Sequence, residues 1–478
     1  MKRTLTSLLV LTSLVLGLAS CQQQPKETKV YIASINDMHA NIDNFPKLAY
    51  VLDSLRALYP DLLLFSAGDN RSGNPINDRA AEPARPMYEL MNAVGFNLTT
   101  LGNHEWDSGI EALRNVMEVA NFPFVCANVT FDDTLHMPIK PYEIFEVNGL
   151  KLGVIGAIQL GLNGLPDFHP NKAIGSHFRP TSEVLPEYLF LKDECNALFL
   201  LSHNGFEDDV ELARQFPQLD AIFGGHTHTL VDSTRLFNGV LVTQAMSRVK
   251  YLTLSIFTFD KDGKLIDKRS EVIPINSVKT VKPEVQAMVD AFNNNDVFAK
   301  VMGYNDAEID HNYECLGSLM ADAARELTGA QLAFQNYGGV RFDTLSVRPI
   351  TLKDLFSLDP FDNELVSFQM TGQEIVDFLG VSFFTDHGPN YCSGCTYSYK
   401  VDDEGMMKDC KVMLSKKKPL DLKATYHVVM NSYMSSAFDF PHPDPGTSTF
   451  RTSNEALSEY LAAHPHINYS KALRVTEK

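Results

Sequence analysis

Short apolar runs alternate with polar clusters through the first half of the chain. Each run is apolar on both faces, which is typical of a buried strand. The runs span 30–35, 62–66, 98–101, 197–201 and 221–223. Helical patterns lie between several of them, at 46–58, 86–94 and 109–120. Strands that alternate with helices predict an α/β layered fold, with β-sheets flanked by helices.

The pattern changes near Asn276. A helical stretch at 283–292 is followed by the polar run 293–296, and we interpret 277–300 as an interdomain linker with a helix. A first domain is predicted at 30–276 and a second, smaller α/β domain at 301–478, as the length of 478 residues suggests. The second domain is expected to contain a helix at 316–327 and strands at 331–335, 396–401 and 426–430.

The N-terminus resembles a processing signal. Lys2 and Arg3 precede the apolar stretch 5–18, and Leu18-Ala19-Ser20-Cys21 resembles a bacterial lipobox. We predict a signal peptide at 1–20, lipidation at Cys21 and a tether at 21–29; an ordinary signal peptide with a chance cysteine is the alternative. The expected product is an exported lipoprotein of the cell envelope, bound to the membrane only through its lipid. The absence of an acidic run after Cys21 favours the periplasmic side of the outer membrane.

Charge and cysteine content narrow the function. The formal net charge of −18 argues against binding a nucleic acid polymer through a basic face. It would also repel an anionic substrate, so bound metal ions are the expected source of local positive charge. Six cysteines remain besides Cys21, and an oxidising compartment permits disulfides. For the C-x-x-C of Cys392 and Cys395, a local disulfide or two buried thiols are both compatible with the sequence.

Candidate metal ligands follow each apolar run of the first domain. They are two carboxylates, four imidazoles and one amide, namely Asp37, His39, Asp69, Asn103, His203, His226 and His228. A single histidine after a strand is more often structural, but five such clusters are not expected by chance. This mixed nitrogen and oxygen set suits Zn, Mn, Co, Fe or a similar divalent ion. Seven ligands exceed what one open catalytic ion needs, so we predict two ions that clamp a phosphoryl group.

The order of these motifs resembles a known family. D-x-H, G-D, G-N-H-E-x-D, H and G-H-x-H occur in this order in the calcineurin-like metallophosphoesterases. The segment 102–107 is similar to the G-N-H-E-F-D of their 5′-nucleotidase branch, with Trp106 in place of phenylalanine. The resemblance covers nearly all of the chain after the signal. It implies a calcineurin-like domain followed by a 5′-nucleotidase C-terminal domain.

The resemblance also implies a role for each cluster. It assigns to one ion Asp37, His39 and His228, to the other Asn103, His203 and His226, and to both Asp69 as a bridge. His104 would not be a ligand but would face the phosphoryl group and stabilise developing charge. Asp107, one helical turn later, would orient His104 or keep it cationic. The attacking group would be a metal-bound hydroxide.

The second domain resembles the substrate-binding half of the same branch. Segment 336–341 is similar to N-x-G-G-I-R, in which paired glycines let the backbone approach a ligand and arginine binds phosphate. The residues that the resemblance assigns to the substrate are Asn336, Gly338, Arg341, the base-stacking Phe361 and Tyr433, and the ribose-binding Asp439. Each aromatic could instead belong to the core, and Arg341 could form a surface ion pair.

Two departures affect the substrate assignment. The family's G-G-D-G loop reads Ala437-Phe438-Asp439-Phe440, which predicts a stiffer, bulkier loop beside the sugar. His311 stands where a second substrate arginine is expected. We therefore predict phosphate release from nucleotides, foremost nucleoside 5′-monophosphates. Nucleotide sugars, 2′,3′-cyclic nucleotides, diphosphates or another small phosphate ester are alternatives, and a non-catalytic surface binding protein is a third. The linker is expected to permit hinged closure.

Overall fold

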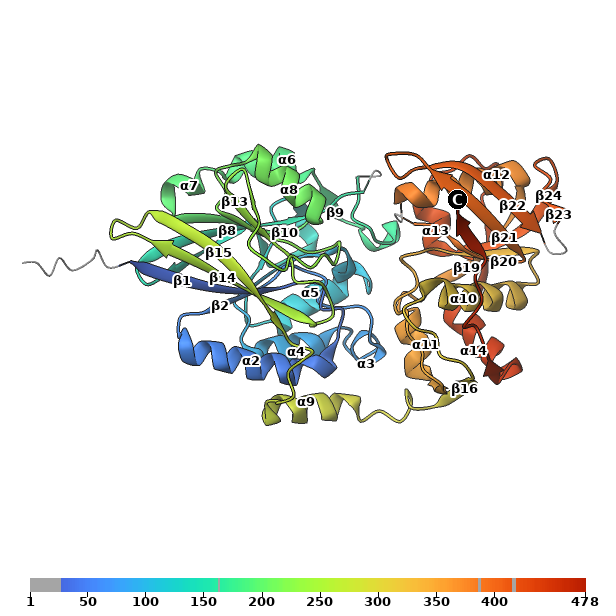
Figure 1. The fold of residues 1–478 in the computed structure, drawn as a ribbon, viewed down its shortest axis with the longest axis horizontal. Helices are drawn as coiled ribbons and strands as arrows, with labels where there is room; N and C mark the ends of the chain where they lie inside the picture. Colours follow the sequence, from blue (N-terminus) through green and yellow to red (C-terminus); the bar gives the residue numbers. More distant parts are fainter. Residues whose placement is uncertain (1–26, 162–163, 386–387, 415–417) are drawn as a thin grey trace, which may run out of the picture.

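The computed structural model describes residues 27–161, 164–385, 388–414 and 418–478. The predicted signal peptide and Cys21 lie outside these residues. In the described ranges, no helix combines the length and the apolar composition that a membrane crossing requires. Figure 1 shows two groups of sheets and helices, which we call the first and second units. The first unit runs to α9 (Pro283–Asn293), and the second begins at β16 (Val301–Asn305).

Two stacked sheets form the centre of the first unit (Figure 1). The first has seven strands, in spatial order β15 (Leu265–Pro274), β14 (Tyr251–Phe259), β1 (Thr28–Ile35), β2 (Leu63–Ser66), β3 (Leu98–Thr100), β4 (Phe124–Val125) and β6 (Ile139–Lys140). The second has six, in the order β12 (Leu236–Phe237), β13 (Val240–Thr243), β11 (Ala221–Phe223), β10 (Ala197–His203), β8 (Leu150–Ile158) and β7 (Tyr142–Val147). β1 to β4 are parallel, as are β8, β10, β11 and β13.

Alternate residues of each strand enter different cores, as the pleat of a strand requires. Val30 and Ile32 of β1 pack between the two sheets, whereas Ala33 contacts the outer helices of the first sheet. The ring of Phe65 in β2 lies 6.0 Å from that of Phe223 in β11, across the space between the sheets. The central strands of both sheets are therefore buried on both faces, and the predicted α/β layered fold is confirmed.

Helices cover the outer face of each sheet (Figure 1). Those over the first sheet are α2 (Phe45–Leu58), α4 (Arg85–Val94), α5 (Ile110–Val119) and α9. Those over the second are α6 (Thr181–Val184), α7 (Leu191–Glu194) and α8 (Phe206–Gln215). Val285 and Val289 of α9 are buried in the same core as α2. The helix of the predicted linker thus packs on the first unit. The residues after Asn293 connect it to the second unit.

The second unit contains a five-stranded sheet. Helices cover one face of this sheet, and two helices and a second sheet cover the other. The strands of the five-stranded sheet are β20 (Tyr391–Ser393), β17 (Leu332–Gln335), β24 (Thr425–Asn431), β19 (Glu364–Thr371) and β25 (Thr447–Thr452). One face carries α10 (Tyr313–Thr328), α11 (Leu352–Leu358) and α14 (Ser453–Ala463). The other carries α12 (Gly372–Thr385), α13 (Ser432–Ala437) and a four-stranded sheet, β23 (Lys418–Pro419), β22 (Met407–Leu414), β21 (Cys395–Val401) and β27 (Val475–Glu477). A three-stranded sheet joins β18 (Arg348–Thr351), β16 and β26 (His466–Ile467).

One local expectation differs from the structure, and the structure decides between two alternatives that the sequence left open. The helix expected from 316 begins at Tyr313, because the Asn312 side chain accepts a hydrogen bond from the Cys315 amide and caps the helix earlier. All six cysteines of the described residues are unpaired. The Cys392 thiol instead donates to the Cys395 carbonyl at 3.3 Å, so buried thiols, and not a local disulfide, are found at the C-x-x-C.

Candidate functional site

The polar clusters meet where the strands of both sheets end. His203 is the last residue of β10, and the loops that leave β1, β2, β3 and β11 carry the other six predicted metal ligands. Parallel strands deliver their carboxyl ends to one edge, which is where ligands bind in open α/β sheets. Stacking two such sheets brings five strand ends together, which accounts for clusters so far apart in sequence.

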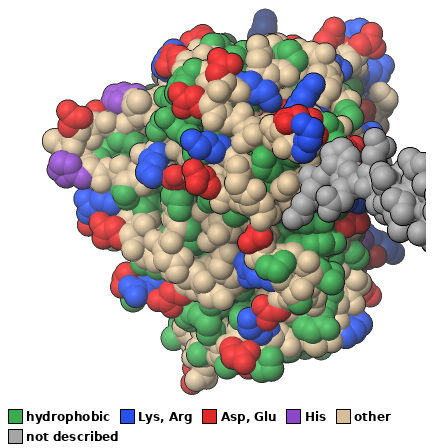
Figure 2. Space-filling view, turned by 90° about the vertical axis from the view of Figure 1, so that its left-hand side faces the viewer, with side chains coloured by type: hydrophobic (Ala, Val, Ile, Leu, Met, Phe, Trp, Pro, Cys, Tyr) green, Lys and Arg blue, Asp and Glu red, His purple; other side chains and the backbone are tan. Residues whose placement is uncertain are grey.

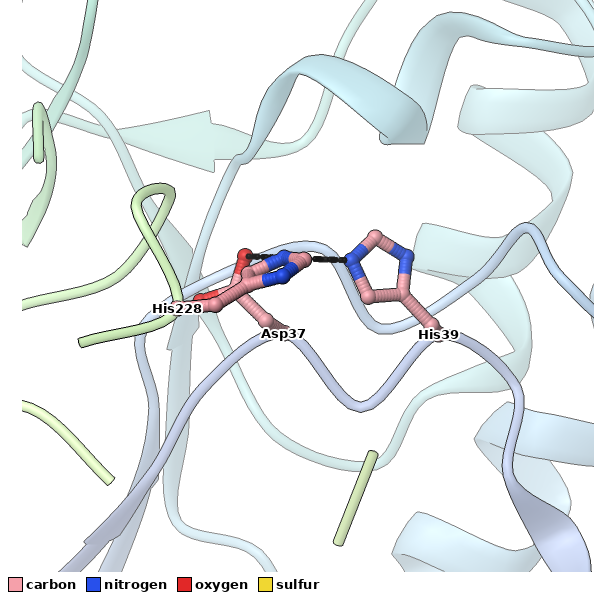
Figure 3. Close-up of side chains that lie close together, drawn as sticks. All are labelled: Asp37, His39 and His228. Carbon is pink, nitrogen blue, oxygen red and sulfur yellow. Dashed lines mark hydrogen bonds and ion pairs between the residues drawn. The ribbon is translucent and has the colours of Figure 1, made fainter. Parts of the chain in front are cut away.

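The first group of donors contains Asp37, His39 and His228. Figure 3 shows the His228 ring between the other two side chains. His228 Nε2 lies 3.3 Å from Asp37 Oδ1 and 3.0 Å from His39 Nε2. Asp37 and His39 are fully buried, whereas His228 is partly exposed. Two ring nitrogens and a carboxylate oxygen that converge in this way form a set of donors for one ion.

A second group of donors lies beside the first. Asn103 Oδ1 is 3.3 Å from His203 Nε2 and 3.1 Å from His226 Nδ1. His203 Nε2 also lies 3.2 Å from Asp69 Oδ2. An amide oxygen, two ring nitrogens and a carboxylate oxygen therefore face one another. Asp37 Oδ1, at 3.9 Å from His203 Nε2, links this group to the first.

Glycines make room for these donors. A Cβ on Gly102 would lie 2.2 Å from Asp69 Oδ1, and one on Gly225 would lie 2.8 Å from His203 Nδ1. Gly68, with φ +85°, would place a Cβ 2.9 Å from the same nitrogen. The backbone thus encloses the donors at distances that exclude any larger residue. Their nitrogen and oxygen chemistry fits divalent cations of the Zn and Mn type.

The electrostatics of the cluster favour a bound cation. Burial would raise the pKa of Asp69, but His203 and His104 hold it well below its usual range. Burial would lower the pKa of His203, but the carboxylates of Asp69 and Asp37 raise it to about 10. Two buried carboxylates therefore depend on nearby positive charge, which a divalent ion provides.

His104 lies beside the donors and is held by Asp107. Its Nδ1 is 2.8 Å from Asp107 Oδ2, and its Nε2 is 3.9 Å from Asp69 Oδ2. Burial would lower the pKa of His104, but the carboxylates of Asp107 and Asp69 raise it. By distance alone His104 also forms a donor set with His39 and Asp69. The contact with Asp107 leaves one ring nitrogen facing the centre, as a group that donates to an anion requires.

Glu105 organises the site and was given no role from the sequence. Its fully buried carboxylate accepts hydrogen bonds from the amides of Asp69, Asn70 and Gly102, at 3.0, 2.8 and 2.7 Å. It thereby ties the loop after β2 to the loop after β3. Its place in the G-N-H-E-x-D segment was the only available signal.

Two residues of the second unit reach the loops that carry the predicted metal ligands. Arg341 Nη2 lies 3.3 Å from both ring nitrogens of His39, and the Arg341 carbonyl accepts a hydrogen bond from Arg248 of the first unit. The Phe361 ring stacks on His104, with centroids 5.6 Å apart and planes at 20°. The guanidinium of Arg341 lies 5.6 Å from the Phe361 ring. These two predicted substrate residues therefore join the first unit at its cluster of donors.

The other predicted substrate residues lie elsewhere in the second unit. Asn336 is buried, and its Oδ1 accepts a hydrogen bond from Asn431 at 2.8 Å. Gly338 is partly buried and its carbonyl accepts from Arg341 Nη1 at 3.3 Å. Tyr433, on α13, is partly buried with its ring 6.2 Å from that of Phe438.

The loop at 437–440, predicted to be bulky beside the sugar, has a different arrangement in the structure. Phe438 and Phe440 are buried in the core beside α12, and Asp439 between them is exposed. Both rings point inward, so the expected bulk beside a ligand is not found. His311, at the position where an arginine was expected, is exposed, and Asp343 raises its pKa through a hydrogen bond.

Comparison with known proteins agrees with this geometry. Residues 30–230 match the calcineurin-like phosphoesterase family, and residues 294–441 match the 5′-nucleotidase C-terminal domain. The chain belongs to the calcineurin-like phosphoesterases that carry a 5′-nucleotidase C-terminal domain. The family resemblance stated from the motifs is thus confirmed, and it supports assignment to the metal-dependent phosphoric ester hydrolases.

Individual relatives are distant in sequence. The chain is 26% identical to a 5′-nucleotidase of Vibrio parahaemolyticus, over 96% of this chain and 95% of that protein. It is also 26% identical to the endonuclease YhcR of Bacillus subtilis, covering 88% of this chain but only 38% of that longer protein. A crystal structure of a 5′-nucleotidase precursor from Thermus thermophilus has the same fold, with a TM-score of 0.84 at 23% identity, over 94% of this chain and 99% of that one.

Proposed function

We propose that the protein is a phosphohydrolase with two metal ions that releases phosphate from nucleotides, with nucleoside 5′-monophosphates as its main substrates. The observation that carries the proposal is the meeting of two sets of groups from different units. Donors for divalent ions end the strands of the first unit, and the Arg341 guanidinium and the Phe361 ring of the second unit lie against them. A phosphate ester attached to a planar base needs both sets.

The donor distances support the metal assignment that the family resemblance implies. We assign one ion to Asp37, His39 and His228, the other to Asn103, His203 and His226, and the bridge to Asp69. Such a pair of ions would activate a water molecule as the nucleophile and neutralise charge on the phosphoryl oxygens. Nitrogen and oxygen donors of this kind accept several metals, so the identity of the ions is left to measurement.

The protein side chains have separate tasks in this scheme. His104, whose protonated form Asp107 favours, donates a hydrogen bond to the phosphoryl oxygens as their charge grows. Arg341 offers a planar fork to the phosphate. The Phe361 ring provides a face on which a base can stack, with little preference for one base. Tyr433 and Asp439 are proposed for the other face of the base and for the ribose, on the resemblance alone.

A substrate panel tests the proposal. Phosphate release would be measured from AMP, UMP, ADP, a nucleotide sugar, a 2′,3′-cyclic nucleotide and an aryl phosphate, each with Mn, Co, Zn or a chelator. We expect chelator-sensitive turnover that favours nucleoside monophosphates over the aryl phosphate by at least about 10-fold, since stacking contributes about 1–3 kcal/mol. His104→Ala should lower kcat about 100-fold.

The other outcomes separate the alternatives. Equal turnover of the aryl phosphate and AMP would retain the metal centre and remove the nucleotide assignment. Preference for the nucleotide sugar or the cyclic nucleotide would replace nucleoside 5′-monophosphates as the proposed substrate and leave the reaction class unchanged. Folded protein that binds metal and hydrolyses none of these compounds would indicate a binding protein instead.

Export and lipid attachment complete the proposal. They rest on the sequence around Cys21, which lies outside the described residues. Mass spectrometry of the protein from its native membrane should find residues 1–20 removed and diacylglycerol on Cys21. A soluble product with an intact Cys21 thiol would contradict lipid attachment and leave the enzyme proposal unaffected.

A further inference from the structure

Asp167 contacts two of the proposed ligands of the same ion. Its carboxylate Oδ2 lies 3.5 Å from His226 Nε2, and its main-chain carbonyl accepts a hydrogen bond from Asn103 Nδ2 at 2.9 Å. The opposite atoms of these side chains, His226 Nδ1 and Asn103 Oδ1, face each other at 3.1 Å within the donor cluster. Asp167 therefore lies behind both ligands, on the side away from the donors.

These contacts favour one tautomer of His226 and one orientation of the Asn103 amide. An imidazole that binds a metal through Nδ1 must carry its proton on Nε2, and a carboxylate close to Nε2 favours that tautomer. An amide that gives Oδ1 to a metal must turn its NH₂ group outward, and the Asp167 carbonyl receives it. Both contacts select the metal-binding orientation of the ligand that they touch.

The segment that carries Asp167 is anchored to the ligand-bearing turn. Phe168 is buried and stacks on Trp106, with ring centroids 5.3 Å apart and planes at 16°. Trp106 belongs to the same short 3₁₀ turn as Asn103, η2 (Asn103–Trp106), and its Nε1 donates to Ser176 Oγ at 3.3 Å. The tryptophan that replaces the family's phenylalanine thus provides the larger ring on which this segment rests.

We infer that Asp167 is a positioning residue of the metal centre, which orients His226 through its carboxylate and Asn103 through its main-chain carbonyl. The inference rests on the proposed function, because it takes the two residues as ligands of one ion. Asp167 is itself 29% exposed in its side chain, so its contact with His226 is a defined pairing at the rim of the site and not a buried charge pair.

Metal binding measured separately from turnover tests the inference. Metal-stripped protein would be titrated with Mn²⁺ by calorimetry, and bound metal counted after gel filtration, for wild type, Asp167→Ala and the isosteric Asp167→Asn. Loss of a partner behind a metal-binding histidine typically lowers affinity 10–100-fold. We expect that loss for one of two ions in Asp167→Ala, a smaller loss in Asp167→Asn, and less than about twofold change for the other ion.

A matched control is available on the surface of the same unit. Asp132 pairs with His177 at 2.8 Å, and both side chains are exposed. Asp132→Asn should leave both affinities unchanged. Two unchanged affinities in Asp167→Ala, or equal losses for both ions, would overturn the inference. Wild-type protein that binds two ions but hydrolyses no phosphate ester would overturn the proposed function alone, since the titration does not depend on turnover.

Discussion

Five of the seven proposed ligands adopt a backbone conformation that residues other than glycine rarely adopt. Their φ angles are positive, namely 49° at Asp37, 46° at His39, 51° at Asp69, 79° at His226 and 54° at His228. Each such residue costs about 1–3 kcal/mol and persists only where its surroundings impose it. Here the Asp37 amide donates to the Gly68 carbonyl, and the His39 amide to the Asp69 carbonyl, each at 3.0 Å. The tight turns let residues two apart point into one centre.

Removing the Asp107 carboxylate should change the pH dependence of turnover. Asp107 raises the pKa of His104, so Asp107→Asn lowers it and His104 loses its proton at a lower pH. If cationic His104 stabilises the phosphoryl group, the alkaline limb of kcat/KM moves to lower pH, and kcat at pH 8 falls about 10–100-fold. Steady-state kinetics between pH 5.5 and 9 would measure this.

Metal content is the control for the Asp107 experiment. It should equal that of wild type, because Asp107 contacts His104 and is not a proposed ligand. An unshifted alkaline limb with normal metal content would show that the charge on His104 does not contribute.

At the scale of elements, the sequence predicted where the chemistry lies but not how it is oriented. Apolar runs mark buried strands, and a polar residue at the end of such a run must emerge at a sheet edge, so the strand ends that position Asp37, Asp69 and His203 could be found. The left-handed backbone of the ligands could not be predicted, because its usual sequence signal is glycine and none of these ligands is a glycine. Asp167 was missed for a related reason, since it lies in an aperiodic segment between Gly164 and Phe168 and touches its partners only in the folded protein.

The second unit was predicted less completely. The sequence predicted α10, β17, β21 and β24 but not its other helices and strands, and the environment of each candidate side chain depends on tertiary packing. Phe438 and Phe440 have the composition expected of either a ligand-facing loop or a core, and only the packing beside α12 decides between them. Phe361 and Tyr433 were both assigned to the base by the resemblance, and the described contacts bring Phe361 to His104.

Helix α8 carries a buried acid that should make stability depend on pH. Asp209 is fully buried, Ser202 Oγ donates to its Oδ1 at 2.5 Å, and its Oδ2 has no partner among the described residues. Burial raises its pKa from 3.8 to about 8. Between these values the folded protein keeps a proton that the unfolded chain has lost, so the free energy of unfolding falls as the pH rises.

Asp209→Asn should remove part of this pH dependence. From pH 5.5 to 8 wild type should lose on the order of 3 kcal/mol that the variant retains. Calorimetric melting of both proteins across this range would show the variant's midpoint rising relative to wild type by several degrees. Parallel midpoints would mean that Asp209 is ionised in the folded protein at both pH values.

At the scale of the whole molecule, charges of both signs share the surface at one end of the first unit (Figure 2), and two basic groups meet beside the candidate site. Figure 2 shows one end of the first unit, where acidic and basic side chains are interspersed. Arg248 and Arg341 lie together at the boundary between the units. These local groups would attract an anionic substrate against the overall charge of −18.

The two units also meet at Arg79, outside the donor cluster. Arg79 Nη2 lies 3.0 Å from Asp362 Oδ1, and its guanidinium lies 3.7 Å from the centre of the Phe356 ring. Asp362 follows Phe361, so this contact helps to hold the aromatic residue against His104. A partly exposed ion pair with a cation–π contact contributes about 1 kcal/mol.

Arg79→Ala should shift the balance between joined and separated units. A loss of about 1 kcal/mol corresponds to a roughly fivefold change in that equilibrium. Spin labels on α3 (Pro75–Asp78) and α11 should report longer distances, and KM should rise more than kcat falls. Arg85→Ala is the control, because Arg85 pairs with Glu82 and Glu89 within the first unit. Equal distance distributions in both variants would exclude a role for Arg79 in joining the units.

The contact between Arg341 and His39 has a consequence for the order of events. Arg341 brings a fixed positive charge to the donors, and loaded metal ions would repel it. A phosphate placed between them turns that repulsion into two attractions. The anion would thus hold the two units together, and the metal-loaded enzyme would close stably only when its substrate is bound.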